Sequence, residues 1–166
     1  MKIVSIASWP PRQCGIACFT ADLRLGLEQN GYRQLPVIAV SSEPGEYRYG
    51  DEVQGEIIQN DPESYTKAAR LINSWAPDAV ILQHEYGLFG GPDGNMILAL
   101  LRDLKVPVIT VLHTVLSRPS AGQYKVMCRL AEYSAKLVII AATAQKTLEE
   151  TYGIGPEKVV HIPHGV

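Results

Sequence analysis

Short apolar runs rich in β-branched residues, separated by helical patterns, constrain the fold of this chain more than any other feature. The clearest runs are KIVSIAS (2–8), QLPVIAV (34–40), DAVILQ (78–83), VPVITVL (106–112) and KLVIIA (136–141). Continuous apolar runs of this length are typical of strands that are buried on both faces of a parallel sheet. We also expect a last strand in KVVHIP (158–163) and a short extra strand in EVQGEIIQ (52–59).

Helical patterns fill the gaps between these runs. Phe19, Leu23 and Leu27 recur every four residues, and Asn30-Gly31 follows as a stop signal. Further helices are predicted from a cap at Asp61, across 97–104, from a capping box at Ser120 and Gln123, and across 143–152. Strands in the second half begin every ~30 residues, the length of one βαβ unit. The chain is therefore predicted to be one Rossmann-like α/β domain spanning 1–166, with a doubly wound, mainly parallel sheet and helices on both faces.

Composition narrows the classes of function. The chain is 46% hydrophobic and 19% charged with a net charge of -2, which is typical of a globular protein and gives no reason to expect a nucleic-acid partner. No apolar run is long enough for a signal peptide or a transmembrane segment. The odd set Cys14, Cys18 and Cys128 indicates a reducing compartment, and we interpret the first two as small core residues rather than half a metal site. We expect a cytoplasmic protein, with peripheral association with a membrane left open.

The predicted topology places the ligand crevice outside the carboxyl ends of the strands. His84 and His113 each follow a predicted strand directly, so both are expected on the crevice side. Gly15 lies just before the first predicted helix, where free backbone N–H groups can bind an anion. The glycine-rich fingerprints of dinucleotide and nucleoside triphosphate sites are absent.

The crevice residues leave several interpretations open. His84 and Glu85 could perform acid–base chemistry, although adjacent side chains of an extended segment point apart. His113 could equally be a structural residue at a strand end. A metal site formed by His84, Glu85 and His113 is disfavoured because their spacing matches no metal motif. We therefore predict no metal.

Four segments in this order, PPRQCGIACFTADL, QHEYGLFGG, LHTVLSRPSAGQ and YGIGPEKVVHIPHGV, resemble the N-terminal domain of a family-4 (group 1) retaining glycosyltransferase. That family has the GT-B fold, in which two Rossmann-like domains face each other across a cleft. The resemblance implies transfer of a sugar, of the hexosyltransferase type, from a nucleotide diphosphate sugar to a sugar or glycoconjugate acceptor with retention of configuration. It also implies that the C-terminal nucleotide-sugar-binding domain is absent from this chain and that the isolated fragment is inactive.

The resemblance also implies residue roles. His113 matches the catalytic-site histidine that lines the donor sugar, and Thr114 follows it. The remaining donor-side positions are Gly15 and Ile16, and the acceptor-side positions are His84, Glu85, Tyr86 and Gly87. No cofactor other than the donor substrate is implied. Two positions depart from the pattern of the family: Cys14 stands where relatives often have glycine, and His164 where many have asparagine.

Two rival interpretations remain. A nucleotide-sugar epimerase of the GT-B type would use acid–base carboxylates in this domain, but Glu85 and Asp93 are the only carboxylates in the crevice loops. A non-catalytic Rossmann-like binding module is the other alternative. The final IPHGV segment argues against a simple module because it reads as a lead-in to more chain.

Overall fold

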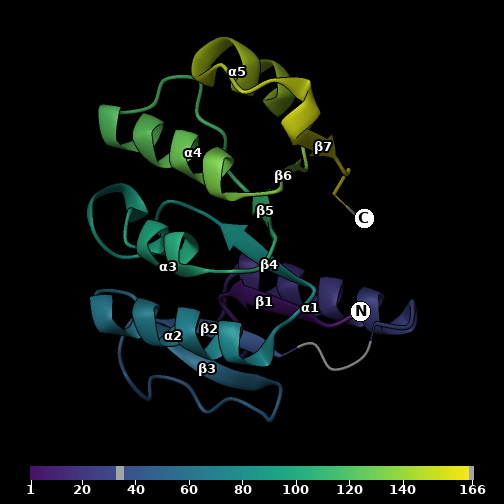
Figure 1. Cartoon of the computed structure of the whole chain (residues 1–166), viewed down its shortest axis with the longest axis vertical. Helices are drawn as coiled ribbons and strands as arrows, with labels where there is room; N and C mark the ends of the chain where they lie inside the picture. The colour runs from purple at the N-terminus through teal and green to yellow at the C-terminus, as the bar shows by residue number, and fades with distance from the viewer. Residues whose placement is uncertain (33–35, 165–166) are drawn as a thin grey trace.

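A computed structural model describes residues 1–32 and 36–164, and these residues form one seven-stranded, all-parallel sheet (Figure 1). The strand order is β3-β2-β1-β4-β5-β6-β7. The strands are β1 (Ile3–Ala7), β2 (Val37–Ser41), β3 (Val53–Ile58), β4 (Ala79–His84), β5 (Val108–Leu112), β6 (Lys136–Ile139) and β7 (Val159–His161). Each predicted strand is confirmed, including the short one at 52–59. Residues 34 and 35 of the second predicted run lie outside the described residues.

The helices follow the predicted signals. They are α1 (Gly15–Gln29), α2 (Pro62–Trp75), α3 (Ile97–Asp103), α4 (Ala121–Tyr133) and α5 (Thr143–Tyr152), with short 3-10 turns η1 (Pro92–Gly94) and η2 (Pro156–Lys158). The capping box of α4 is confirmed: Ser120 Oγ accepts from the Gln123 N–H at 3.0 Å, and Gln123 Oε1 accepts from the Ser120 N–H at 2.8 Å. Asp61 Oδ1 accepts from the Glu63 N–H at 3.0 Å and caps α2.

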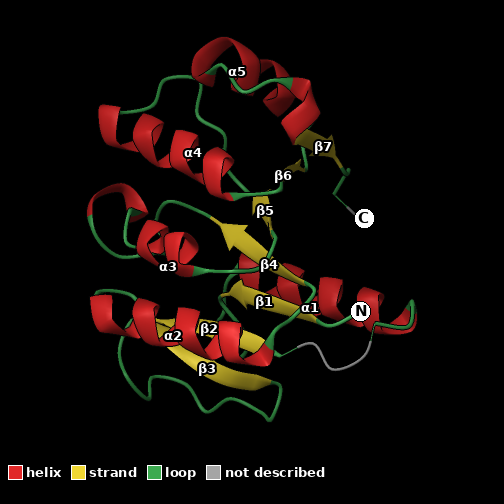
Figure 2. Cartoon of the chain, in the orientation of Figure 1, coloured by secondary structure: helices red, strands yellow, loops and turns green. Residues whose placement is uncertain are grey.

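Helices cover both faces of the sheet, but unequally (Figure 2). From β1 the chain first adds β2 and β3 on one side of the sheet, and then adds β4 to β7 on the other side. Because right-handed crossovers in opposite directions place their helices on opposite faces, α1 covers one face and α2 to α5 cover the other. Helices α2, α3, α4 and α5 contact one another in that order. The predicted doubly wound α/β fold is confirmed, with one helix against four.

The main hydrophobic core lies under the four-helix face. Its largest fully buried side chains include Ile6, Leu82, Ile97, Leu112 and Leu130. A smaller cluster on the other face joins buried residues of β1, β4 and β5 to Phe19, Leu23 and Leu27 of α1. The apolar stripe predicted for the first helix is thus the contact between α1 and the sheet.

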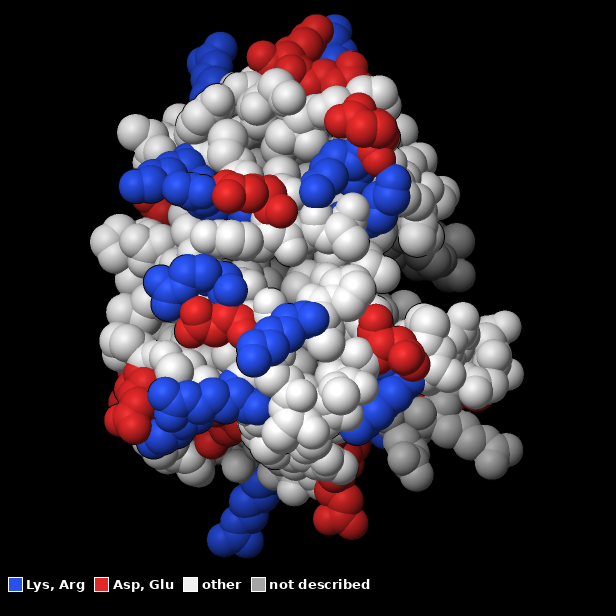
Figure 3. Space-filling view, in the orientation of Figure 1, with Lys and Arg blue, Asp and Glu red and all other residues white. Residues whose placement is uncertain are grey.

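The surface over α2, α3 and α4 carries charges of both signs. Figure 3 shows lysines and arginines interspersed with aspartates and glutamates on this face. Pairs such as Lys67–Glu63 at 3.1 Å and Arg129–Glu132 at 2.5 Å lie along single helices. None of the helices in the described ranges has the length and apolar character needed to cross a bilayer.

Candidate functional site

Segments that are far apart in the sequence meet at the carboxyl ends of β1, β4 and β5. The strand register pairs His84 with Leu112, and the backbone N–H of His113 donates to the His84 carbonyl at 3.1 Å. The ring of Phe19, one turn into α1 from Gly15, lies edge-on against the His113 ring with the centroids 5.1 Å apart. The same Phe19 ring lies 5.5 Å from the ring of His164. The start of α1, the end of β5 and the last described residue therefore share one rim.

The N-terminus of α1 is open to solvent. Gly15 is exposed, and a Cβ atom built there would meet no atom within 4 Å. Within the described residues, no protein group accepts a hydrogen bond from the N–H of Gly15 or Ile16. Unpaired first-turn N–H groups together with the helix dipole form a site that favours an anion.

His113 is half-buried at the end of β5. Its Nε2 lies 2.8 Å from Oε1 of Gln83. Burial lowers the pKa of His113 and is the main influence, while Glu85 acts to raise that pKa and His164 to lower it. The imidazole is consequently neutral at neutral pH. Next to it, Thr114 Oγ1 donates to Glu85 Oε2 at 2.5 Å.

Gln83 is a site residue that sequence reasoning missed. It is fully buried in β4, and its side chain reaches the neighbouring strand to meet His113. The available signal was a single amide at the end of an apolar run, directly before His84 and Glu85. Its significance depends on the pairing of β4 with β5, which the sequence does not show.

The imidazole of His84 lies on the opposite side of the sheet from His113. His84 is the last residue of β4 rather than the first of a loop, and its side chain has no exposed surface. The rings of Tyr86 and Phe89 pack against it with centroids 5.0 and 6.2 Å away. Neither ring nitrogen has a hydrogen-bond partner among the described residues, and burial lowers the pKa of His84 to about 3.

The loop after β4 is tightly packed. Tyr86 is buried, its hydroxyl donates to the Gln123 carbonyl at 3.4 Å, and burial raises the pKa of that hydroxyl. Gly87 is exposed, and its carbonyl accepts from Gln59 Nε2 at 2.9 Å. Of the four predicted acceptor-side residues, the structure therefore brings Glu85 and Gly87 to the surface and keeps His84 and Tyr86 inside.

Comparison with known families agrees with this arrangement. The family model "Glycosyltransferase Family 4" matches residues 15–166, from the first residue of α1 to the end of the chain. The chain belongs to glycosyltransferase family 4. The family predicted from the four sequence segments is confirmed. None of the curated proteins matches the chain.

Cys14, the residue directly before α1, has a structural role. The Cys14 Sγ accepts from the Ala17 N–H at 3.4 Å and lies 3.0 Å from Ser8 Oγ, so it caps α1. Cys18, by contrast, is exposed. Its interpretation as a core residue is wrong because it lines the solvent-exposed hollow that also contains Gly15, Phe19 and Leu23.

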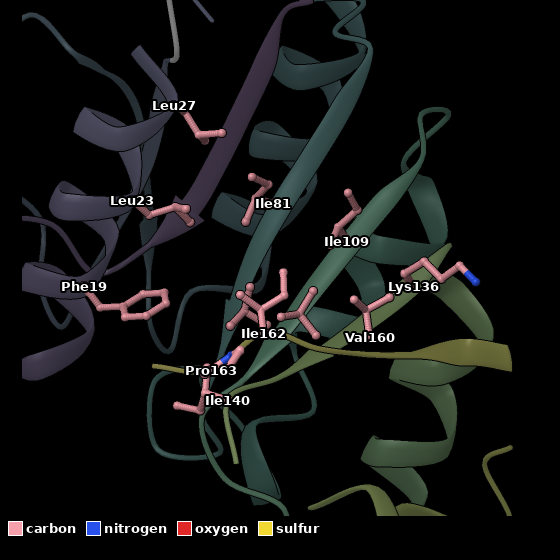
Figure 4. A pocket seen from close by; sticks show the side chains of 12 residues that line it. Phe19, Leu23, Leu27, Ile81, Ile109, Lys136, Ile140, Val160, Ile162 and Pro163 are labelled. Carbon is pink, nitrogen blue, oxygen red and sulfur yellow. The ribbon is translucent and has the colours of Figure 1, made fainter. Parts of the chain in front are cut away.

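An open apolar groove lies beside the rim, between α1 and the face of β4 to β7 that none of the described helices covers. Its volume is about 370 Å³, and Figure 4 shows Phe19, Leu23 and Leu27 along one wall. Ile162 and Pro163 line both this groove and the hollow that contains Gly15 and His164. In the described part of the chain, no three histidine, cysteine or acidic side chains are grouped to hold a metal ion.

Proposed function

We propose that this chain is the acceptor-side half of a retaining glycosyltransferase. It would act with a nucleotide diphosphate sugar, and a sugar or glycoconjugate would receive the hexosyl group. The observation that carries the proposal is the shared rim, where the free N–H groups of α1 lie on the same side of the sheet as His113, bridged by Phe19.

The start of α1 suits the leaving group. When the bond between the sugar and the diphosphate breaks, negative charge builds on the diphosphate. The N–H groups of Gly15 and Ile16 and the positive end of the helix dipole would offset that charge. The open space at Gly15 would let phosphate oxygens approach the backbone closely.

His113 suits the sugar side of the same bond. A neutral imidazole, or the His113 carbonyl, can accept a hydrogen bond from a sugar hydroxyl and orient the ring while positive charge develops on it. Thr114 follows at the strand end, where its hydroxyl is held by Glu85. The helix terminus and neutral polar groups would suffice for this step, so we expect no metal ion to be required.

On the acceptor side, we assign direct contact to Glu85 and Gly87. Both reach the surface, whereas His84 and Tyr86 would support the loop from within. The hydrogen bond from Thr114 to Glu85 would link the acceptor loop to the donor side of the rim.

The rest of the reaction would need a second domain. We propose that a C-terminal Rossmann-like domain holds the nucleotide and closes over the rim, which would exclude water that otherwise hydrolyses the donor. The isolated chain should bind nucleotide sugar poorly and should not turn it over. We place the reaction in the cytoplasm, in carbohydrate biosynthesis.

The test compares His113→Ala with His161→Ala in the full-length protein. His161 is exposed in β7, so its substitution is the matched control. We expect His113→Ala to lower turnover by roughly 100-fold or more with folding unchanged, and the control to keep wild-type turnover. Unchanged turnover in His113→Ala would remove the residue from the mechanism. An inverted product would overturn retention, and interconversion of the nucleotide sugar without acceptor would identify an epimerase instead.

A further inference from the structure

Gln83 is a fully buried amide in β4, on the sheet face that packs under α1. The side chain of Ile81 lies on the same face of β4, in the cluster under α1. Gln83 Oε1 is paired with His113 Nε2, while Gln83 Nε2 has no hydrogen-bond partner among the described residues. A fully buried amide with an unpaired donor costs free energy. An apolar residue would pack better at this position. The hydrogen bond from His113 to the amide oxygen is therefore the reason for a polar side chain here.

The pairing determines where His113 carries its proton. An amide oxygen can only accept a hydrogen bond, so the His113 Nε2 must be the donor. In a neutral imidazole the other nitrogen, Nδ1, is then the acceptor. The titratable groups that shift the pKa of this ring are Glu85, which follows β4, and His164 at the end of the described chain. The His113 ring in turn helps to lower the pKa of His84.

Two further contacts hold the ring in place. The backbone of His113 is hydrogen-bonded to the His84 carbonyl, and the Phe19 ring of α1 packs against the imidazole from the groove side. Gln83 therefore holds the imidazole through a hydrogen bond at Nε2, and Phe19 holds it through a T-shaped ring contact. The nitrogen left for a ligand is Nδ1.

We propose that Gln83 is a positioning residue that holds His113 as the neutral Nε2–H tautomer and presents Nδ1 to a hydroxyl of the bound sugar. The inference rests on the function proposed above. A carboxylate at position 83 would favour the charged imidazolium. That charge would repel the positive charge developing on the sugar, so a neutral acceptor is suited to this position where a glutamate is not.

The first experiment needs no activity. Long-range proton–nitrogen NMR correlations on the ¹⁵N-histidine-labelled chain distinguish the two imidazole tautomers, and the His113→Gln variant identifies the His113 signals. We expect the Nε2–H form in the wild type and a mixture of tautomers in Gln83→Met, which keeps the side-chain length but removes the acceptor. Gln54→Met, an exposed position on β3, is the matched control and should leave the spectrum of His113 unchanged. A wild-type Nδ1–H form, or an unchanged His113 tautomer in Gln83→Met, would overturn the proposal.

The second experiment uses Gln83→Glu in the full-length protein. The new carboxylate should raise the pKa of His113, so the ring becomes charged at neutral pH. Turnover at neutral pH should fall roughly 10- to 100-fold and recover as the pH rises and the ring loses its proton. A loss that is equal at every pH would indicate structural damage and would contradict the proposal.

The two experiments separate the positioning role from the proposed function. If the NMR results hold but His113→Ala transfers sugar normally, the function proposed for His113 fails while its pairing with Gln83 stands. If His113→Ala abolishes transfer but the wild-type ring is protonated at Nδ1, the function stands and the role of Gln83 fails.

Discussion

Burial of His84 should make the chain sensitive to acid. The folded state holds the pKa of His84 at about 3, whereas the ordinary value in an unfolded chain is 6.5. The unfolded state therefore binds a proton that the folded state refuses, and stability is lost as the pH falls from 6.5 toward 3. Each pH unit in that window costs about 1.4 kcal/mol, so lowering the pH from 7 to 4 should cost about 3 kcal/mol through this residue alone.

The variant His84→Leu isolates that contribution. Leucine is of similar size, and no hydrogen bond of the imidazole is lost because neither nitrogen has a partner in the described residues. At pH 7 the variant should be about 1–3 kcal/mol more stable than the wild type, because two buried nitrogens without partners are removed. Between pH 7 and pH 4 this difference in the free energy of unfolding should grow by about 3 kcal/mol. Urea titrations at pH 7, 6, 5 and 4 measure both differences.

The pH dependence of stability is compared with that of a control variant. His161→Leu removes an exposed histidine and should leave the pH dependence of stability as in the wild type. If wild type and His84→Leu lose stability in parallel between pH 7 and pH 4, the imidazole is not shielded from protons and the reasoning from burial is wrong. A loss of several kcal/mol in the variant at pH 7 would reveal a partner of the ring.

Two further perturbations test the packing around the site. Gly90→Ala would place a Cβ 1.8 Å from the Gln59 carbonyl oxygen, so we expect the free energy of unfolding to fall by at least about 2 kcal/mol in thermal or urea unfolding. In the matched control Gly87→Ala, the Cβ meets nothing within 4 Å, and the free energy of unfolding should change by less than about 1 kcal/mol. Equal effects in the two variants would contradict the close approach. Ser120→Ala removes the side-chain half of the box with Gln123 and should cost about 1 kcal/mol, with a lower melting temperature as the readout.

Local signals in the sequence predicted the elements of the fold well. The Ser120–Gln123 capping box and the stop at Gly153 depend on atoms a few residues apart, and Gly153 has the left-handed backbone that favours glycine, with φ 67°. The strand at 52–59 was predicted from its pattern in the same way. The backbone of His113 was also predicted at the correct edge of the sheet, because its position depends only on where the apolar run of β5 ends.

Side-chain direction was harder to predict. His84 and Gln83 are neighbours in β4, and alternation sends one into the core under the four-helix face and the other toward α1. Nothing in the run DAVILQH says which face is which, because both faces of that strand are largely apolar. The exposure of Cys18 was missed because a small side chain gives little indication of its side of a helix.

By itself, the sequence determined the seven strands, the order of helices between them and the family, since these depend on local patterns and on an ordered set of short segments. The tertiary structure decided which polar groups meet: the pairing of Gln83 with His113, the contact of Phe19 with that ring, and the burial of His84. These contacts join residues from different strands and a distant helix, and only the register of β4 with β5 and the packing of α1 bring them within reach.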